Sequence, residues 1–289
     1  MLSFLSQSIP SKRTVIMNIK QSFFCFIFFF WTAIICQPAW SAEPAMPSKF
    51  QSILKTGTLR VGVALFTPWV FKGKSGNLVG FEIDVAKKIA KDMNLEPKIS
   101  SYDWNMLIPA LMDGQIDIIV AGMAITPQRA LKVNFSQPYA TAGINIATNL
   151  TLTKNIDSLK GLNQEKIKIG VVTETVSEDL AQRVFTKASI IKYKTSKEAE
   201  SDLVSGKIHV YMESKPIPKF IALEHPSKID VPLSKPLLIT KAGLAVKKGN
   251  PDFLNFLNSW ITARESDTWL KSTHDYWFKS LKWRKKFLP

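Results

Sequence analysis

The segment Ile116–Tyr139 combines an apolar strand, a glycine turn, a helix start and an arginine, and together these features favour anion binding. Gly122 allows the backbone to turn after the strand, and Thr126 followed by Pro127 is typical of a helix N-cap and its first helical position. Arg129 then falls in the first helical turn. Free N–H groups at a helix start attract anions, and a planar guanidinium offers two parallel donors to a carboxylate. We therefore predict that Arg129 binds a small carboxylic acid.

An alternative is that Arg129 is an ordinary surface charge on a solvated helix. Two features of its context argue for binding instead. A cation in the first turn opposes the helix dipole, so a bound anion would compensate it. The preceding strand also ends where open α/β sheets usually bind ligands.

Residues 1–41 have the pattern of a secretory signal peptide. Phe23–Ile35 is an apolar run of thirteen residues, too short to span a bilayer comfortably, and it follows a basic residue. The small residues Ala39 and Ser41 fit the rule for cleavage near Ser41. We predict export to the periplasm and removal of this segment. Translation could begin at Met1, or at Met17, which gives a normal basic start to the peptide.

Export would remove both cysteines, Cys25 and Cys36, so the mature chain has no disulfide, thiol nucleophile or thiolate metal site. About 248 residues would remain, enough for one large domain or two modest ones. They carry 35 basic and 23 acidic residues, a formal charge of +12 that is spread along the chain apart from Lys282–Lys286. The histidines share no metal-ligand spacing, and no phosphate loop or serine elbow is present. We predict no metal, no cofactor and no nucleic-acid partner.

Strand patterns and helix patterns alternate along the mature chain. Apolar residues recur at helical spacing in Phe81–Met93, directly after a β-rich run, and a second alternating series follows between Lys168 and Met212. Such alternation predicts an α/β fold with mostly parallel sheets, built here from two units. The expected strands are Leu59–Ala64, Pro97–Tyr102, Ile116–Val120, Lys168–Val172, Ile190–Tyr193 and Ile208–Met212, and the expected helices are Phe81–Met93, Trp104–Met112, Ser177–Phe185 and Lys197–Val204.

The two series repeat one short pattern. Leu111–Ile118 and Leu203–Val210 both read L-x-x-G-x-I, which is a helix end, a glycine C-cap and a strand start. The match is short, so independent use of a common helix-turn-strand solution is an alternative. It nevertheless fits two units of similar construction.

Several first-unit motifs resemble a known family. The motifs are Leu59–Lys72, Gly80–Asp84, Ile108–Leu111, Ala121–Met123 and Ile125–Tyr139. In order and spacing they are similar to the family 3 periplasmic solute-binding proteins, which deliver polar amino acids to ABC importers. The resemblance implies a monomer that hands a small carboxylate ligand to an inner-membrane ABC permease.

The same resemblance implies a fold and its boundaries. The fold is the type II periplasmic binding protein fold, in which two α/β lobes are joined by two crossing strands and close on a ligand in the cleft. Lobe 1 would comprise residues 42–143 and 244–289, and lobe 2 residues 149–238. The crossing strands would be residues 144–148 and 239–243.

Carried over residue by residue, the resemblance also implies a binding site. Arg129 would hold the ligand carboxylate, and Thr175 would join it when the lobes close. Phe66 and Trp104 would enclose the ligand, although core packing is the commoner fate of an aromatic; Trp69 we assign to the core. The full set of expected ligand-binding residues is Arg129, Phe66, Trp104, Ala121, Gly122, Ala124, Thr175 and Glu213.

The chain departs from the family where an amino group should bind. Acidic residues are usual in the family at two positions that here are Ala64 and Ser214. A buried ammonium without an acidic partner costs several kcal/mol, so an ordinary α-amino acid pose is in doubt. Glu213 or Glu174 could supply the missing charge from one residue away. Otherwise the ligand lacks the amine or carries it elsewhere.

The leading interpretation is a binding protein without catalytic activity. A second is an enzyme resembling cyclohexadienyl dehydratase, with Glu213 as the acid and a ring accommodated by Ala64, Ala124 and Val176. A third is a periplasmic helper or sensor that uses its surface. For that interpretation the relevant aromatic residues are Trp269, Tyr276, Trp277, Phe278 and Trp283, which could equally be packed against the first lobe.

Overall fold

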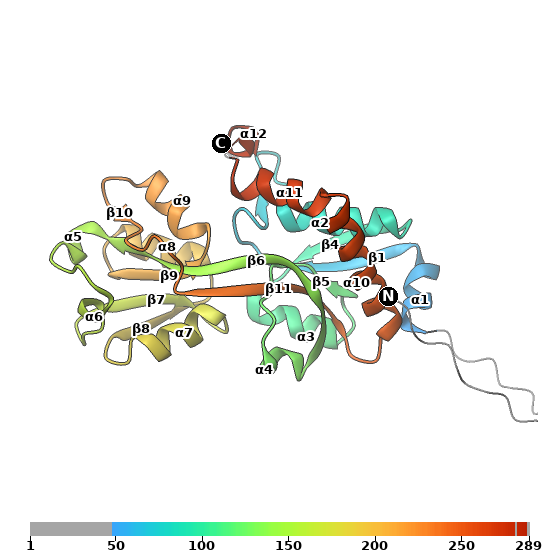
Figure 1. Ribbon diagram of the computed structural model, residues 1–289, viewed down its shortest axis with the longest axis horizontal. Coiled ribbons are helices and arrows are strands. Elements are labelled where there is room, and N and C mark those ends of the chain that lie inside the picture. Colours follow the sequence, from blue (N-terminus) through green and yellow to red (C-terminus); the bar gives the residue numbers. More distant parts are fainter. Residues whose placement is uncertain (1–47, 281, 288–289) are drawn as a thin grey trace, which may run out of the picture. The chain divides into compact units, whose positions relative to one another are not determined.

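The computed structural model describes residues 48–280 and 282–287, and these described residues form one compact unit (Figure 1). The predicted signal peptide, residues 1–41, lies outside the described residues. Among the helices that are described, none has both the length and the hydrophobicity that a membrane span requires.

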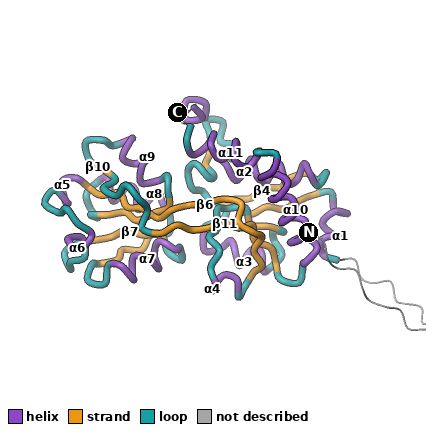
Figure 2. Tube along the Cα trace, viewed as in Figure 1, coloured by secondary structure: helices purple, strands orange, loops and turns teal. Residues whose placement is uncertain are grey.

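Two groups of parallel strands make up most of a nine-stranded sheet (Figure 2). The first group comprises β1 (Thr58–Val63), β4 (Glu96–Ser101) and β5 (Ile118–Ile119). The second group comprises β7 (Lys168–Val172), β8 (Ser189–Tyr193) and β9 (Val210–Ser214). β2 (Phe71–Lys72) and β3 (Leu78–Val79) form a separate hairpin. The predicted α/β alternation is confirmed, although β5 is shorter and β9 begins later than expected.

Helices alternate with these strands. Those that accompany the first group are α1 (Lys49–Thr56), α2 (Phe81–Asp92), η1 (Trp104–Met106), α3 (Leu107–Met112), α4 (Pro127–Ala130), α10 (Pro251–Ser266) and α11 (Trp269–Phe278). Those that accompany the second group are α5 (Leu150–Thr153), α6 (Leu159–Leu162), α7 (Val176–Val184), α8 (Ser196–Val204) and α9 (Ile217–Glu224). The last described helix is α12 (Lys282–Phe287).

Two long antiparallel strands connect the groups. β6 (Val133–Asn149) pairs with β11 (Leu238–Lys247) along its first part and with β9 along its last part. The short β10 (Ile229–Asp230) pairs with the end of β6. The predicted crossing segments, residues 144–148 and 239–243, lie within β6 and β11. The division into two lobes that move relative to each other stays a prediction.

The repeated pattern has the same packing role in both groups. Gly114 and Gly206 adopt positive φ angles of 73° and 79°, as C-cap glycines do. The isoleucine two residues later then packs on a strand glycine. A Cβ at Gly170 would lie 2.5 Å from Cδ1 of Ile208, and a Cβ at Gly62 would clash with Cδ1 of Ile116. The two groups therefore share a detail of construction.

The C-terminal aromatic residues are packed into the core of the first group. Trp277 and Trp283 are buried, and their rings lie 5.5 Å apart. Phe220 of α9 reaches the same cluster, with its ring 5.8 Å from that of Trp283. Beside them Arg284 forms an ion pair with Glu224 of α9. These contacts favour packing over the surface-docking interpretation of the aromatic stretch, and they place α12 against α9.

We expect Gly170→Ala to lower the free energy of unfolding by about 1–3 kcal/mol, because the added methyl group overlaps Ile208 in a close-packed interior. Urea denaturation measures the change. Gly73→Ala is the matched control, since its Cβ would be 3.4 Å from the nearest atom, an ordinary contact. Equal stability of the two variants would contradict the packing described here.

Candidate functional site

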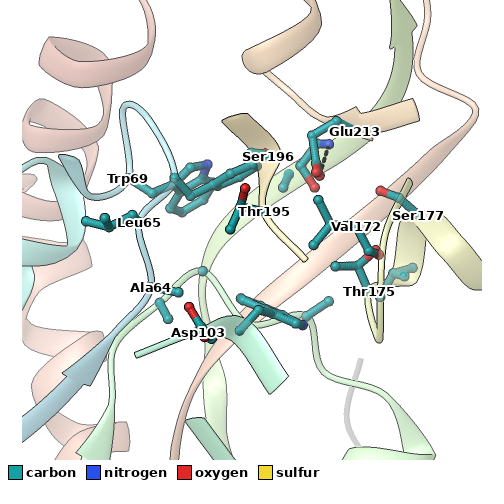
Figure 3. Close-up of a pocket in the computed structure, with 18 of the residues that line it drawn as sticks. Ala64, Leu65, Trp69, Asp103, Val172, Thr175, Ser177, Thr195, Ser196 and Glu213 are labelled. Carbon is teal, nitrogen blue, oxygen red and sulfur yellow. Dashed lines mark hydrogen bonds between the residues drawn. The ribbon is translucent and has the colours of Figure 1, made fainter. Parts of the chain in front are cut away.

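A cavity of about 530 Å³ is lined by residues of both strand groups (Figure 3). It opens at the carboxyl ends of β1 and β7, where Ala64 and Val172 contribute to its wall. All of the residues expected to bind ligand line it, namely Arg129, Phe66, Trp104, Ala121, Gly122, Ala124, Thr175 and Glu213. Ala64 and Ser214, the positions of the departures, line it as well, and so does Val176.

Arg129 is held in place from both sides of the cavity. Its Nη1 donates to the carbonyl of Ala124 at 3.0 Å, and its Nη2 donates to the carbonyl of Glu174 at 3.0 Å. The guanidinium carbon lies 5.3 Å from the centre of the Trp104 ring. Burial lowers the pKa of Arg129, which the charges of Asp179 and Glu174 partly oppose. No other side-chain hydrogen bond of Arg129 occurs within the described part of the chain, so its other N–H groups can serve a ligand.

The helix that carries Arg129 is short. Thr126 is its N-cap and accepts a hydrogen bond from the Arg129 N–H at 3.3 Å, as predicted. However, α4 has four residues, and so short a helix has only a small dipole. The guanidinium, more than the helix start, therefore makes this wall attractive to an anion.

The turn before α7 accepts two hydrogen bonds from the first group through the carbonyl of Glu174. Glu174 has a positive φ of 59°, and its carbonyl accepts from both Arg129 and Nε1 of Trp104, the latter at 3.0 Å. The Glu174 side chain is exposed, and Glu174 is not among the described residues that line the cavity. Glu174 thus contributes its backbone, which disfavours it as the substitute partner for a ligand amine.

Gly122 is supported by a buried pair that the sequence analysis missed. Its N–H donates to the Tyr139 hydroxyl at 3.1 Å, and that hydroxyl donates to the Glu82 carboxyl at 2.8 Å. Gly122 has a φ of 60°, and a Cβ there would lie 3.0 Å from the Trp69 ring. Burial raises the pKa of Glu82 to about 8. An acidic residue on the buried face of a helix is the signal that could have identified Glu82.

Trp69 has a second role besides the core position assigned to it. It is 2% exposed, as expected for a core residue, and yet it lines the cavity beside Gly122. Within the described part of the chain its Nε1 has no hydrogen-bond partner. The sequence predicts the burial of such an aromatic but cannot say which wall of a cavity it forms.

Glu213 and Thr175 are already engaged by their own neighbours. The Glu213 carboxylate accepts from Tyr211 Oη at 2.9 Å and from the Ser214 N–H at 2.6 Å. Burial raises the pKa of Glu213 to about 7. The Thr175 hydroxyl caps α7 by accepting from the Glu178 N–H at 3.3 Å, and it donates to the Val172 carbonyl at 2.7 Å. Both side chains line the cavity, but their hydrogen bonds stabilise the second group.

The aromatic and small residues shape the remaining wall. Phe66 is half-buried, and its backbone exchanges hydrogen bonds with Val70 at 2.7 and 2.8 Å. Ala64 and Ala124 are buried and leave space that larger residues would fill. Lys194, Thr195, Ser196 and Lys197, at the start of α8, also line the cavity, and the sequence analysis did not select them.

Comparisons with known proteins agree with this geometry. Residues 59–280 match the family described as bacterial extracellular solute-binding proteins, family 3. The L-cystine-binding protein TcyJ of Escherichia coli (strain K12) is 27% identical over 233 residues, which are 78% of this chain and 84% of that protein. A solved structure described as the binding component of an ABC transporter from Wolinella succinogenes, complexed with lysine, is 32% identical with a TM-score of 0.74. The match covers 79% of this chain and 99% of that one.

One related protein is an enzyme. The cyclohexadienyl dehydratase of Pseudomonas aeruginosa is 21% identical over 236 residues, which are 81% of this chain and 88% of that protein. Most of the other related proteins are named as binding proteins for an amino acid or a similar compound. The structural similarity confirms the predicted type II periplasmic binding protein fold.

The buried Glu82 should make stability depend on pH. Its folded-state pKa is raised to about 8, so the stability that the protonated carboxyl provides is complete at acidic pH and is lost as pH rises through that value. We expect wild type to lose on the order of 3 kcal/mol more than Glu82→Gln between pH 5 and pH 9. Urea denaturation at several pH values tests this, because other titrating groups cancel in the difference. Parallel pH profiles for the two proteins would show the assignment to be wrong.

Proposed function

Because the chain belongs to the bacterial extracellular solute-binding proteins of family 3, we propose that it captures an amino acid or a related carboxylate and delivers it to an ABC importer. The related proteins of known ligand support this class, since they are named for cystine binding or are complexed with lysine. Under this proposal the chain acts in the periplasm after loss of residues 1–41. It works as a monomer, and its partner is an inner-membrane permease.

The observation that carries the proposal is the cavity position of Arg129. Its guanidinium is partly dehydrated, is fixed by two carbonyls and has N–H groups left over. A ligand carboxylate would accept charge-assisted hydrogen bonds from them. Trp104 and Phe66 offer apolar faces for the rest of the ligand. An arginine that only solvates the surface would not need to be fixed by two carbonyls in a cavity with N–H groups left over.

Capture would couple to movement about β6 and β11. The Glu174 carbonyl, at the turn before α7, accepts from Arg129 and Trp104 of the first group. Movement of the second group away from the first would break these two hydrogen bonds. A ligand that neutralises the guanidinium lowers the cost of burying it in that arrangement. Ligand binding would therefore favour the closed arrangement.

We expect Arg129→Ala to weaken binding of the preferred carboxylate by at least about 100-fold, because it removes a charged two-pronged donor from a dehydrated site. Titration calorimetry with amino acids and organic acids identifies the ligand and measures the loss. Arg183→Ala is the control, since Arg183 is exposed and is not among the described lining residues. If Arg129→Ala binds the ligand as tightly as wild type, the proposed role of Arg129 is excluded.

A dehydratase is the second candidate function, and Glu213 is the observation that favours it. A buried carboxyl with a pKa near 7 keeps a proton available to a leaving hydroxyl at neutral pH. Against this, both Glu213 oxygens accept hydrogen bonds from the second group. The binding function therefore remains the stronger proposal.

Incubation with prephenate and arogenate separates the two functions. We expect no aromatic product, because the Glu213 carboxyl is already occupied by its neighbours. Product formation is followed by ultraviolet absorbance, with Glu213→Gln as the matched variant. If wild type forms the product and Glu213→Gln does not, the protein is a dehydratase, and the proposed binding function is wrong.

A further inference from the structure

Within the described part of the chain, two acidic side chains line the cavity, and they differ in how many hydrogen bonds they already make. Glu213 is 4% exposed, and its oxygens accept hydrogen bonds from Tyr211 and Ser214. Asp103 is exposed, and its carboxylate makes no hydrogen bond or ion pair with any residue that the structure describes. It occupies the N-cap position of η1, yet it does not cap that helix. An acid in this position usually bonds to the helix start, so the Asp103 carboxylate is free for another partner.

The strand register brings Asp103 to the cavity wall. β1 and β4 run in parallel with Val63 opposite Ser101, and the Tyr102 N–H donates to the Val63 carbonyl at 2.9 Å. Ala64 directly follows β1, and Asp103 lies two residues beyond the end of β4, so both residues leave the sheet at the same ends of two neighbouring strands. Figure 3 shows the Asp103 carboxyl next to Ala64, and both residues line the cavity.

The positive charges in the cavity lining limit where a cationic group of a ligand could bind. Arg129, Lys194 and Lys197 are the cationic residues in its described lining. A positively charged ligand group is repelled near each of these, and the acids are the lining residues of full opposite charge. Of the two acids, Glu213 is already satisfied and loses its charge readily, since burial favours its protonated form. Asp103 is the remaining partner for a cation.

We propose that Asp103 is the counter-ion for a cationic group of the ligand, an ammonium or a guanidinium, while Arg129 holds the ligand carboxylate. The proposal rests on the carboxylate-binding function proposed above. It assigns the amine-binding role, which appeared to be missing at Ala64 and Ser214, to a residue on a neighbouring strand end. Asp103 precedes Trp104, whose ring lies 5.3 Å from the Arg129 guanidinium. Asp103, Trp104 and Arg129 all line the cavity, so the Trp104 ring is available to the aliphatic part of a ligand that carries both charges.

Titration calorimetry on Asp103→Asn tests the proposal with a matched ligand set. The probes are lysine, arginine, glutamine and cystine, together with 6-aminohexanoate, norleucine and hexanoate. We expect Asp103→Asn to weaken the amine-bearing probe that wild type binds best by at least about 30-fold, because a charge-assisted contact to a carboxylate is lost. Hexanoate, which has no amine, should bind both proteins equally. A loss confined to 6-aminohexanoate assigns the side-chain cation, and a loss confined to norleucine assigns the α-ammonium.

Matched variants keep the outcomes distinct. Asp113→Asn is the control for a surface carboxylate, since Asp113 is exposed and is not among the described lining residues. Thermal unfolding confirms that Asp103→Asn folds. Three results would overturn the proposal. Asp103→Asn could bind the amine-bearing probes as tightly as wild type, or it could lose hexanoate affinity to the same extent. Alternatively, Glu213→Gln and not Asp103→Asn could abolish the preference for amine-bearing probes. If wild type binds hexanoate in an Arg129-dependent way but no amine-bearing probe, the carboxylate function survives and the role of Asp103 fails; if it binds no carboxylate, both fail.

Discussion

The ligand preference that we propose for the cavity depends on one group, the partly dehydrated guanidinium of Arg129. A cation removed from water must be compensated by acceptors, and here the acceptors come from opposite sides, at Ala124 and Glu174. Two backbone carbonyls carry partial charges only, so they offset the loss of hydration incompletely. A ligand carboxylate would complete the compensation. Under the proposed function, the same interaction would favour a carboxylate and would link its binding to closure of the second group onto the first.

The surrounding fold keeps this interaction in place by packing that is repeated in both strand groups. In each group a helix ends at a glycine with positive φ, and an isoleucine two residues later packs on a strand glycine. This packing fixes the strand ends that carry Ala64 on one side and the turn at Glu174 on the other. The buried Glu82–Tyr139 pair adds a hydrogen bond to the Gly122 backbone from behind. This part of the cavity wall therefore has its backbone N–H satisfied by a buried hydroxyl and not by a ligand.

The sequence predicted those parts of the site that depend on local chemistry. A threonine cap, a proline and an arginine within four positions define the start of α4, and no distant residue is needed to recognise them. The alternating helices and strands were predicted for the same reason. Asp103 and Trp69 were not selected, because their proximity to the ligand cavity depends on which strand lies beside β1 and on which side of a buried ring faces the cavity. The Glu82–Tyr139 pair spans 57 positions of sequence and was missed for that reason.

The polar groups that line the cavity differ in whether they already have a hydrogen-bond partner within the protein. In the second group, Thr175 caps α7, Thr195 caps α8, and Ser196 is hydrogen-bonded to Tyr211. These hydroxyls line the cavity but already have partners, and Glu213 is engaged in the same way. In the first group, by contrast, Arg129 keeps N–H groups and Asp103 keeps a carboxylate that no described residue uses. The second group also has unpartnered groups in the described lining, namely the Ser177 hydroxyl and the ammonium groups of Lys194 and Lys197. Only groups without partners gain hydrogen bonds from a ligand without losing others. Ligand choice should therefore depend mainly on Arg129 and Asp103, with the two lysines and Ser177 available to further polar groups of the ligand.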